Sequence, residues 1–403
     1  MLHMLFTDPC SDMGIARTAM SICRHLNGPG LSACMHVPTA ANSVRAPFLR
    51  PSLPYIRFPV PWEPHFRFIA RYARARMYRR FLDSLKAGDI AYLWSDVAMS
   101  CVNELAERDI RIIREKFNCH TAAAQRILDE AYARLGVART LGRIPARVVE
   151  DERRTLALAD LVSSPSPAVT ESLIQEGVPA EKIVETSYGW DPRLTTAHRC
   201  VLPPADGVTV LFVGAVCVRK GAHLLLECWS RAGVRGRLVL CGPVEPLIAE
   251  LYRDELRRPD VVTPGRVRDV WSFYRSADLL VLPTLEEGSP LVCYEALASG
   301  LPALVSPMGA GSVVRDGQEG FVLDCSDREA WTDALRRLSD DEELRRHMSG
   351  AARQRAIEFT WERTGARRRF EFLRRLRPGA ESALTAPDRS MQASPPREAC
   401  IPE

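Results

Sequence analysis

The chain has 403 residues, of which 46% are hydrophobic and 26% are charged, and its formal net charge is +4. This composition excludes disordered, collagen-like and coiled-coil proteins, and the small net charge argues against a dedicated nucleic-acid-binding protein. The length exceeds the roughly 250–300 residues that one hydrophobic core usually organises, so we expect two domains.

The twelve cysteines are scattered from Cys10 to Cys400, without a C-x-x-C pair and without a histidine cluster at zinc-site spacing. We therefore expect reduced thiols and no metal site. The amino-terminal residues do not form a signal peptide, and the longest strongly apolar run, 208–218, is shorter than the roughly 18 residues of a membrane span. We expect a cytoplasmic protein that is at most peripherally bound to the inner face of the membrane.

In the first half of the chain, short apolar runs alternate with helical patterns, which is typical of parallel α/β layers. The runs at 3–6 and 90–94 predict strands, and the amphipathic segment 14–26 predicts a helix. The segment RIIREKFN at 111–118 is predicted to pass from a strand into a loop.

Residues 65–85 form a basic segment in which arginines are interleaved with aromatic and aliphatic side chains. A basic amphipathic helix of this kind rests on an anionic membrane or holds an acidic acceptor. The alternative is an ordinary surface helix whose apolar stripe is buried in the first domain. We expect burial for the apolar residues, and we assign the arginine excess to membrane or acceptor contact.

The second half shows the alternation of strands and helices more clearly. A break in the pattern at 195–207, with two adjacent prolines, marks the expected boundary between the two domains. The elements that follow predict a doubly wound sheet. We expect strands at 208–216, 237–242, 278–283 and 302–306, and helices at 221–233, 269–277 and 291–300.

The segment 279–302 carries the clearest chemical pattern. Its strand is followed by a polar loop and by a Gly-Ser-Pro tripeptide at 288–290 that leads into a helix. A helix start presents backbone N–H groups and the positive end of the dipole, which suit a diphosphate. Glu287 before the helix and Glu295 within it are placed to accept hydrogen bonds from two sets of sugar hydroxyls. The alternative is that Glu287 complements the dipole and Glu295 is solvated.

A pair of cations, Arg219 and Lys220, follows the strand at 208–216, with Lys220 six residues after Gly214. Cations in the loop after a strand can neutralise the charge of a diphosphate leaving group. The alternative interpretation is a solvated turn.

The two motifs together resemble those of the family 4 retaining glycosyltransferases. E-G-S-P-L-V-C-Y-E-A-L-A-S-G-L-P is similar to the family's E-G-F-G-x-x-x-x-E-A-M-A-x-G-x-P, and LFVGAVCVRKG is similar to its F-V-G-R-x-x-x-x-K-G. The resemblance implies an α/β GT-B fold, in which two Rossmann-like domains face each other across a cleft. It implies an acceptor-side domain at 1–200, a nucleotide-sugar domain at 201–360, and a helix at 361–377 that returns to the first domain. We expect residues 378–403 to be a disordered tail.

The resemblance also implies roles for individual residues. The family's first glutamate contacts the transferred sugar and its second binds the ribose, and these roles fall to Glu287 and Glu295. Glu287, Lys220 and His120 are the implied catalytic residues, and Gly14 belongs to the first-domain loop that faces the diphosphate. A lone histidine such as His120 is otherwise a structural residue. The implied donor-binding residues are Gly214, Arg219, Lys220, Gly242, Glu287, Gly288, Ser289, Pro290, Leu291 and Glu295.

Three positions depart from the family pattern. Ala215 stands where an arginine is frequent, Ser289-Pro290 replaces Phe-Gly, and Ser312 stands where a glutamate is frequent. These departures favour, as one alternative, a noncatalytic nucleotide-sugar-binding partner.

The function implied by the resemblance is transfer of a sugar, with retention of configuration, from a nucleotide diphosphate sugar to a glycan or lipid-linked glycan, as in polysaccharide biosynthesis. The chain has no Asp-x-Asp motif, so we expect a metal-independent reaction that needs no cofactor besides the donor substrate. A GT-B nucleotide-sugar epimerase or phosphorylase remains a further alternative. A dinucleotide dehydrogenase is disfavoured because no G-x-G-x-x-G motif opens either half.

Overall fold

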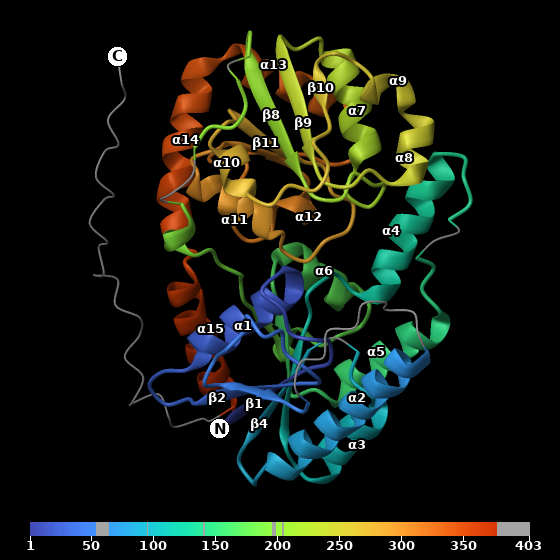
Figure 1. Ribbon diagram of the computed structural model, residues 1–403, viewed down its shortest axis with the longest axis vertical. Coiled ribbons are helices and arrows are strands. Elements are labelled where there is room, and N and C mark those ends of the chain that lie inside the picture. Colours follow the sequence, from blue (N-terminus) through green and yellow to red (C-terminus); the bar gives the residue numbers. More distant parts are fainter. Residues whose placement is uncertain (54–63, 95, 140–141, 196–198, 204, 377–403) are drawn as a thin grey trace.

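The computed structural model describes residues 1–53, 64–94, 96–139, 142–195, 199–203 and 205–376 (Figure 1). The tail expected at 378–403 lies outside these residues. Two parallel sheets, each flanked by helices, form two lobes stacked along the long axis of the molecule (Figure 1).

The first sheet contains, within the described residues, seven parallel strands in the order β3-β2-β1-β4-β5-β6-β7. Every residue of β1, β2 and β4 is buried, as expected for a parallel sheet covered on both faces. The strands are β1 Leu2–Phe6, β2 Ala33–Val37, β3 Leu49–Pro51, β4 Ile90–Trp94, β5 Arg111–Glu115, β6 Leu161–Ser164 and β7 Ile183–Glu185.

Six α-helices and two short 3-10 helices accompany this sheet in the described part of the chain. The structure confirms the helix predicted at 14–26 and the strands predicted at 3–6 and 90–94. The α-helices are α1 Gly14–Leu26, α2 Pro64–Ser84, α3 Met99–Glu107, α4 Thr121–Arg134, α5 Ala146–Leu158 and α6 Pro167–Gln175, and the 3-10 helices are η1 Ala180–Lys182 and η2 Pro192–Leu194.

The second sheet has six parallel strands, counted over the described residues, in the order β10-β9-β8-β11-β12-β13. Its strands are β8 Val208–Val213, β9 Gly236–Cys241, β10 Val261–Val262, β11 Leu279–Leu282, β12 Ala303–Val305 and β13 Gly320–Val322. Its helices are α7 Ala222–Ala232, α8 Pro246–Leu251, α9 Arg253–Leu256, α10 Val270–Tyr274, α11 Leu291–Ala298, α12 Pro307–Ala310, α13 Arg328–Asp340 and α14 Glu342–Ile357.

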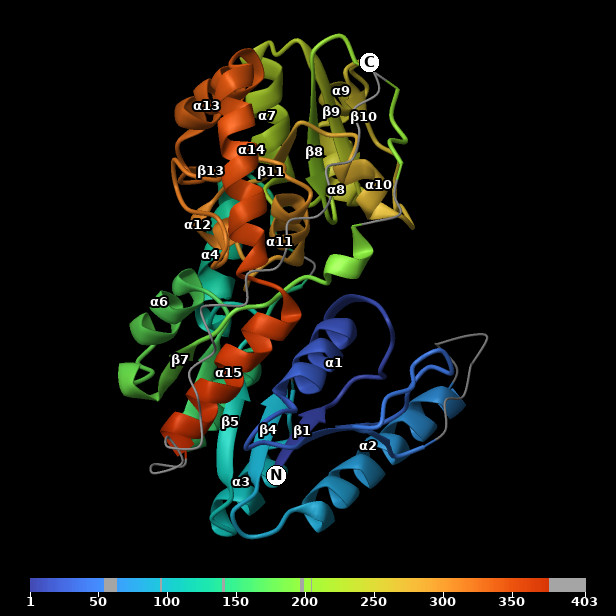
Figure 2. The same ribbon diagram turned by 90° about the vertical axis from the view of Figure 1, so that its left-hand side faces the viewer.

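The last helix, α15 (Trp361–Leu376), crosses from the second lobe to the first and packs against α1 (Figure 2). The two helices approach closely at Gly365, where a Cβ atom would lie 2.3 Å from the Cβ of His25. Arg368 on α15 is buried and forms an ion pair with Glu115 at 2.8 Å. Helix α15 is therefore part of the first domain's core, and both domains are doubly wound α/β units of a GT-B fold.

Candidate functional site

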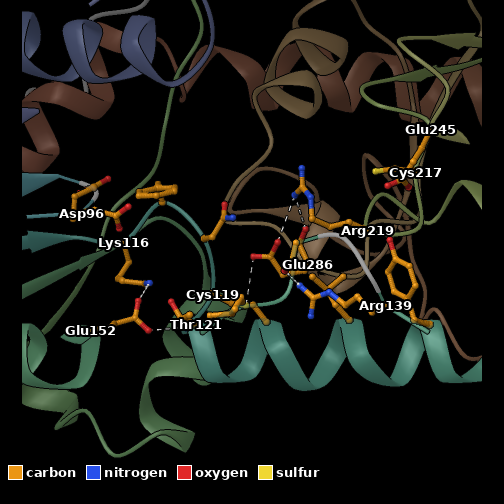
Figure 3. Close-up of a pocket in the computed structure, with 18 of the residues that line it drawn as sticks. Asp96, Lys116, Cys119, Thr121, Arg139, Glu152, Cys217, Arg219, Glu245 and Glu286 are labelled. Carbon is orange, nitrogen blue, oxygen red and sulfur yellow. Dashed lines mark hydrogen bonds and ion pairs between the residues drawn. The ribbon is translucent and has the colours of Figure 1, made fainter. Parts of the chain in front are cut away.

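A cavity of 430 Å³ lies between the two domains, at the carboxyl ends of their strands. Ligands of open α/β sheets bind at this edge, beyond the carboxyl ends of the strands. One wall comes from the loop after β5 and from α4, and the other comes from the loops after β8, β9 and β11 (Figure 3). Its charged lining residues are Asp96, Arg114, Glu115, Lys116, Arg139, Glu152, Arg219, Glu245 and Glu286.

The predicted cation pair lies beside this cavity. Arg219 donates a hydrogen bond to the backbone carbonyl of Glu286 at 3.0 Å, and its Nη1 lies 3.3 Å from Oε2 of Glu287. The Nζ of Lys220 forms an ion pair with the same oxygen of Glu287. Two cations therefore share one carboxylate oxygen at the edge of the cleft.

Two of the three side chains in this cluster are largely shielded from water. The side chains of Lys220 and Glu287 are 11% and 15% exposed, whereas that of Arg219 is 36% exposed. Burial, together with the neighbouring positive charge of Arg219, lowers the pKa of Lys220 to about 8. Oε2 of Glu286 also lies 3.5 Å from Nη1 of Arg219, so two cations face two carboxylates here. A bound anion would therefore have to replace a carboxylate as the partner of these cations.

The helix α11 begins next to the cluster. Its first residue is preceded by Pro290, and no side chain caps its amino terminus. Glu295, on the second turn, accepts a hydrogen bond at 3.0 Å from the hydroxyl of Tyr274. Although part of Glu295 is open to solvent, the surrounding protein desolvates its carboxylate and raises its pKa to about 7. The predicted phosphate cradle and ribose acceptor are thus parts of one helix.

The first turn of α1 approaches this helix from the other domain. Gly14 has a φ of +56°, is exposed, and has open space where a Cβ atom would be. Arg17, one turn further, is also exposed, and its positive charge lowers the pKa of Glu295. Arg17 is not among the residues that line the cavity, but its charge acts on Glu295 from the first domain. Its position after Gly14 on the predicted helix was a usable signal for it.

The predicted glycines of the second domain have identifiable packing roles. Gly214 follows β8 with a φ of +143°, and Gly242 follows the neighbouring strand β9. A Cβ atom on Gly242 would lie 1.8 Å from the carbonyl oxygen of Gly214. Gly242 therefore allows the two loops to pass each other at the carboxyl edge of the sheet.

The loop before α11 is docked onto the first domain. A Cβ atom on Gly288 would lie 1.9 Å from the carbonyl oxygen of Phe117, and Ser166 donates a hydrogen bond to the carbonyl of Gly288 at 2.6 Å. The hydroxyl of Ser289 lies 2.6 Å from that of Tyr294, inside the second domain. Ser289 is buried and Leu291 is partly exposed, so the side chain of Ser289 does not face the cavity.

The structure does not bring His120 to the cavity wall formed by the described residues. The ring is fully buried, and its Nδ1 accepts a hydrogen bond from the backbone N–H of Ala122 at 3.2 Å, which caps α4. Its Nε2 lies 3.3 Å from Glu152, and burial lowers the pKa of the ring. This arrangement corresponds to the structural alternative and gives no support to the predicted catalytic role, because a position after a strand does not fix the direction of a side chain.

Lys116 is a residue of the first domain that was not predicted for the site. It directly follows β5, lines the cavity and forms an ion pair with Glu152. Cys119 also lines the cavity, with its thiol 3.6 Å from Oε1 of Glu286 across the domain interface (Figure 3). The signal for Lys116 was available, since the end of β5 was predicted within RIIREKFN.

The departure at Ser312 has a structural role. Its hydroxyl donates a hydrogen bond at 2.9 Å to the carbonyl of Pro165 in the first domain. Ser312 therefore contributes to the domain interface and is not one of the residues that line the cavity.

The basic segment forms α2, in which some apolar side chains are buried and others are exposed. Ala73, Met77 and Phe81 are buried against the first domain, as expected for the apolar stripe. Phe68 and Tyr72, however, are 73% and 51% exposed, contrary to that expectation. No helix in the described part of the chain is long and apolar enough to cross a membrane.

One group of potential metal ligands exists among the described residues, away from the cavity. It consists of His3, Cys34 and His36 on β1 and β2. This group could not be predicted, because spacing along one segment does not show which strands become neighbours.

Comparisons with known proteins agree with this architecture. Residues 207–341 match the family described as "Glycosyl transferases group 1", and residues 13–189 match the "Glycosyl transferase 4-like domain". The D-inositol 3-phosphate glycosyltransferase of Corynebacterium urealyticum is 29% identical over 213 residues, which are 49% of this chain and 50% of that protein. The chain thus spans about half the length of the curated relatives it matches.

Solved structures show the same fold over nearly the whole chain. Sucrose-phosphate synthase from Thermosynechococcus elongatus has a TM-score of 0.68 at 19% identity, over 93% of this chain and 98% of that one. Anabaena HepE, solved in complex with UDP and glucose, has a TM-score of 0.60 at 14% identity, over 92% and 99% of the two chains. Because the two family models match both domains and the fold agrees with them, the chain belongs to the group 1 glycosyltransferases of the family 4 type.

Proposed function

We propose that the chain transfers a sugar from a nucleotide diphosphate sugar to a hydroxyl group of an acceptor, with retention of configuration at the anomeric carbon. The observation that carries the proposal is the cluster in which Arg219 and Lys220 share one oxygen of Glu287 beside the start of α11. Retention of configuration rests on the resemblance of the motifs to those of the retaining family.

The cluster supplies the charge that departure of a diphosphate requires. As the glycosidic bond to the donor breaks, negative charge grows on the leaving phosphate. Lys220 and Arg219 stabilise this charge most strongly where water is largely excluded. A diphosphate at these cations replaces Glu287 as their partner, and Glu287 then accepts hydrogen bonds from the sugar hydroxyls. In this proposal the two side chains supply the charge without an obligatory metal ion at the donor site.

The nucleotide is proposed to lie along α11. Ionised Glu295 accepts hydrogen bonds from the ribose hydroxyls, and Tyr274, at 3.0 Å, holds its carboxylate in place. The positive charge of Arg17 on α1 acts on Glu295 from the first domain. We propose that the exposed turn at Gly14, which precedes Arg17 on the same helix, faces the diphosphate. The UDP in the HepE structure supports a uridine diphosphate sugar as the first donor to test.

The acceptor is proposed to be a hydroxyl-rich glycan or a lipid-linked glycan that binds in the cavity. The described lining includes five acidic and four basic side chains, so it offers many hydrogen-bonding groups and little net charge. Such a lining favours a neutral polyhydroxylated acceptor over a strongly anionic one. The curated relatives are named for an inositol phosphate acceptor, which is the competing candidate.

We also propose that the protein acts in the cytoplasm and contacts anionic membranes through α2. Phe68 and Tyr72 are exposed on the same helix as the exposed arginines Arg71 and Arg79. Aromatic side chains beside cations are the combination that binds the interface of an anionic bilayer. This contact would place the cavity close to a lipid-linked acceptor.

The test is a transfer assay with purified protein, UDP-sugars and glycan acceptors. We expect UDP release that depends on the acceptor, and we expect Glu287→Gln to lower turnover by about 10²-fold or more while UDP still raises the melting temperature. Glu227→Gln, in the same domain but paired with Arg328, is the matched control. Unchanged turnover in Glu287→Gln would sink the assignment, and UDP binding without turnover under any acceptor would favour the noncatalytic alternative.

A further inference from the structure

Three potential metal ligands meet between β1 and β2, in the first domain. Nδ1 of His3 lies 3.2 Å from Nε2 of His36, and Sγ of Cys34 lies 3.5 Å from each of these nitrogens. The three side chains are 3%, 6% and 2% exposed, so the cluster is buried. Two imidazole nitrogens and one sulfur thus form a nearly equilateral triangle.

The dimensions of this triangle are those of one face of a tetrahedral zinc site. Zinc binds histidine nitrogen at about 2.0–2.1 Å and cysteine sulfur at about 2.3 Å, which at tetrahedral angles separates two nitrogens by about 3.3 Å and a nitrogen from a sulfur by about 3.5 Å. The separations in this cluster are 3.2 Å and 3.5 Å. Neutral imidazoles and a thiolate are also the ligands that zinc prefers.

The surroundings supply the partners that metal-binding histidines usually have. The other ring nitrogen of His3, Nε2, lies 3.5 Å from a carboxylate oxygen of Asp89, an arrangement that orients a ligating ring and fixes its tautomer. The hydroxyl of Ser84 on α2 lies 3.1 Å from Nδ1 of His3, on the ligating side of the ring. Ser84, directly or through a water molecule, is therefore the candidate for the fourth position.

The backbone explains how the cluster arises. His3 and Cys34 are register partners on the parallel strands β1 and β2, and Cys34 and His36 are two residues apart, so their side chains project from the same face of the sheet. His36 also contacts Phe81 of α2, with its ring centroid 5.4 Å away. One ion at this place would join two strands and the helix that covers them.

We propose that His3, Cys34 and His36 bind one zinc ion at a structural site. None of the three residues lines the cavity, and His3 and Cys34 are each the second residue of their strand, with His36 the fourth of the five residues of β2. The site is thus separate from the proposed chemistry. The competing interpretation is a metal-free cluster in which the two imidazoles and the thiol hydrogen-bond to one another.

The experiment uses the full chain, stripped by a chelator and reloaded with Zn²⁺ or Co²⁺. We expect one equivalent of zinc per chain after desalting, measured by plasma mass spectrometry, and a higher melting temperature than that of the stripped protein. The cobalt form should show the absorption of a tetrahedral site together with a thiolate-to-cobalt charge-transfer band. No bound metal, or a cobalt spectrum without that band, would overturn the proposal even if every variant failed to fold.

Two variants and a control locate the site. Cys34→Ser should abolish the charge-transfer band, and His36→Ala should lose the equivalent of zinc. Cys101→Ser removes another buried thiol of the same domain and should retain both signals. Full zinc binding together with an unchanged cobalt spectrum in Cys34→Ser would overturn the assignment, because the metal would then lie elsewhere.

Discussion

Two lysine–glutamate pairs lie at the interdomain cleft, one in each domain, and they differ in how completely they are satisfied. Glu152 pairs with Lys116, lies 3.3 Å from Nε2 of His120 and accepts a hydrogen bond at 2.7 Å from the backbone N–H of Thr121. These partners outweigh burial, which would raise the pKa of Glu152, and lower it to about 2. Lys220, by contrast, shares Glu287 with a second cation, and its own pKa is lowered to about 8. The first pair is a completed structural link, whereas the second is positioned to exchange its carboxylate for a diphosphate.

The strongest test of this comparison replaces the lysine of each pair in turn. Lys116→Met leaves the buried carboxylate of Glu152 without its cation, so we expect a loss of about 3–5 kcal/mol in the free energy of unfolding. Denaturant unfolding measures the loss, and Lys86→Met, an exposed position in the same domain, is the control. A Lys116→Met protein as stable as the wild type would show that this pair does not hold the domain together.

The corresponding change in the second pair should affect catalysis more than stability. Lys220→Met removes one of two cations from the proposed diphosphate site, so we expect kcat/KM to fall by about 10²–10³-fold. Because Glu287 keeps Arg219 as a partner at 3.3 Å, the melting temperature should change much less than in Lys116→Met. Steady-state kinetics and thermal melting of the two variants side by side check this. A larger loss of melting temperature in Lys220→Met than in Lys116→Met, without a loss of kcat/KM, would contradict the comparison.

The pH dependence of kcat/KM sharpens the contrast. Glu295 ionises as the pH rises through about 7, which favours ribose binding, and Lys220 loses its proton as the pH rises through about 8, which weakens diphosphate binding. We therefore expect a narrow optimum between these values. Lys220→Arg should move the alkaline limb of the kcat/KM profile to higher pH, because a guanidinium stays protonated. A profile that is flat from about pH 6 to about pH 9 would contradict these assignments.

A smaller effect is expected from Tyr274→Phe. The hydroxyl of Tyr274 lowers the pKa of Glu295 by hydrogen bonding to its ionised form. Its removal should shift the acid limb of the kcat/KM profile to higher pH with little change at the alkaline limb. Tyr252→Phe, which removes a hydroxyl bonded to Glu227 at 2.6 Å, is the control. An unshifted acid limb in Tyr274→Phe would show that Glu295 does not govern it.

The smallest expected effect concerns the membrane contact of α2. Charge reversal at Arg71 and Arg79 should reduce co-sedimentation with anionic liposomes several-fold and leave transfer to a soluble acceptor unchanged. Reversal of Arg147 and Arg154, two exposed arginines of α5, is the matched control. Equal liposome binding by both variants would remove the membrane proposal.

The sequence predicted much of the second domain because its motifs are local. Glu287, Glu295 and the start of α11 lie in one continuous segment, so a pattern of spacing was sufficient to place them together. The burial of His120 could not be predicted, because the sequence located the end of β5 but not the direction of each side chain after it. The cluster of His3 with Cys34 and His36 could not be predicted from the sequence, because it depends on the register between two strands.

The most direct test of the account is a crystal structure of the protein with a bound nucleotide diphosphate. We predict that diphosphate oxygens take the place of the Glu287 carboxylate at Nζ of Lys220, that Arg219 contacts the same group, and that Glu295 accepts hydrogen bonds from the ribose. A complex in which the Lys220–Glu287 pair stays intact, with the nucleotide bound elsewhere, would contradict it.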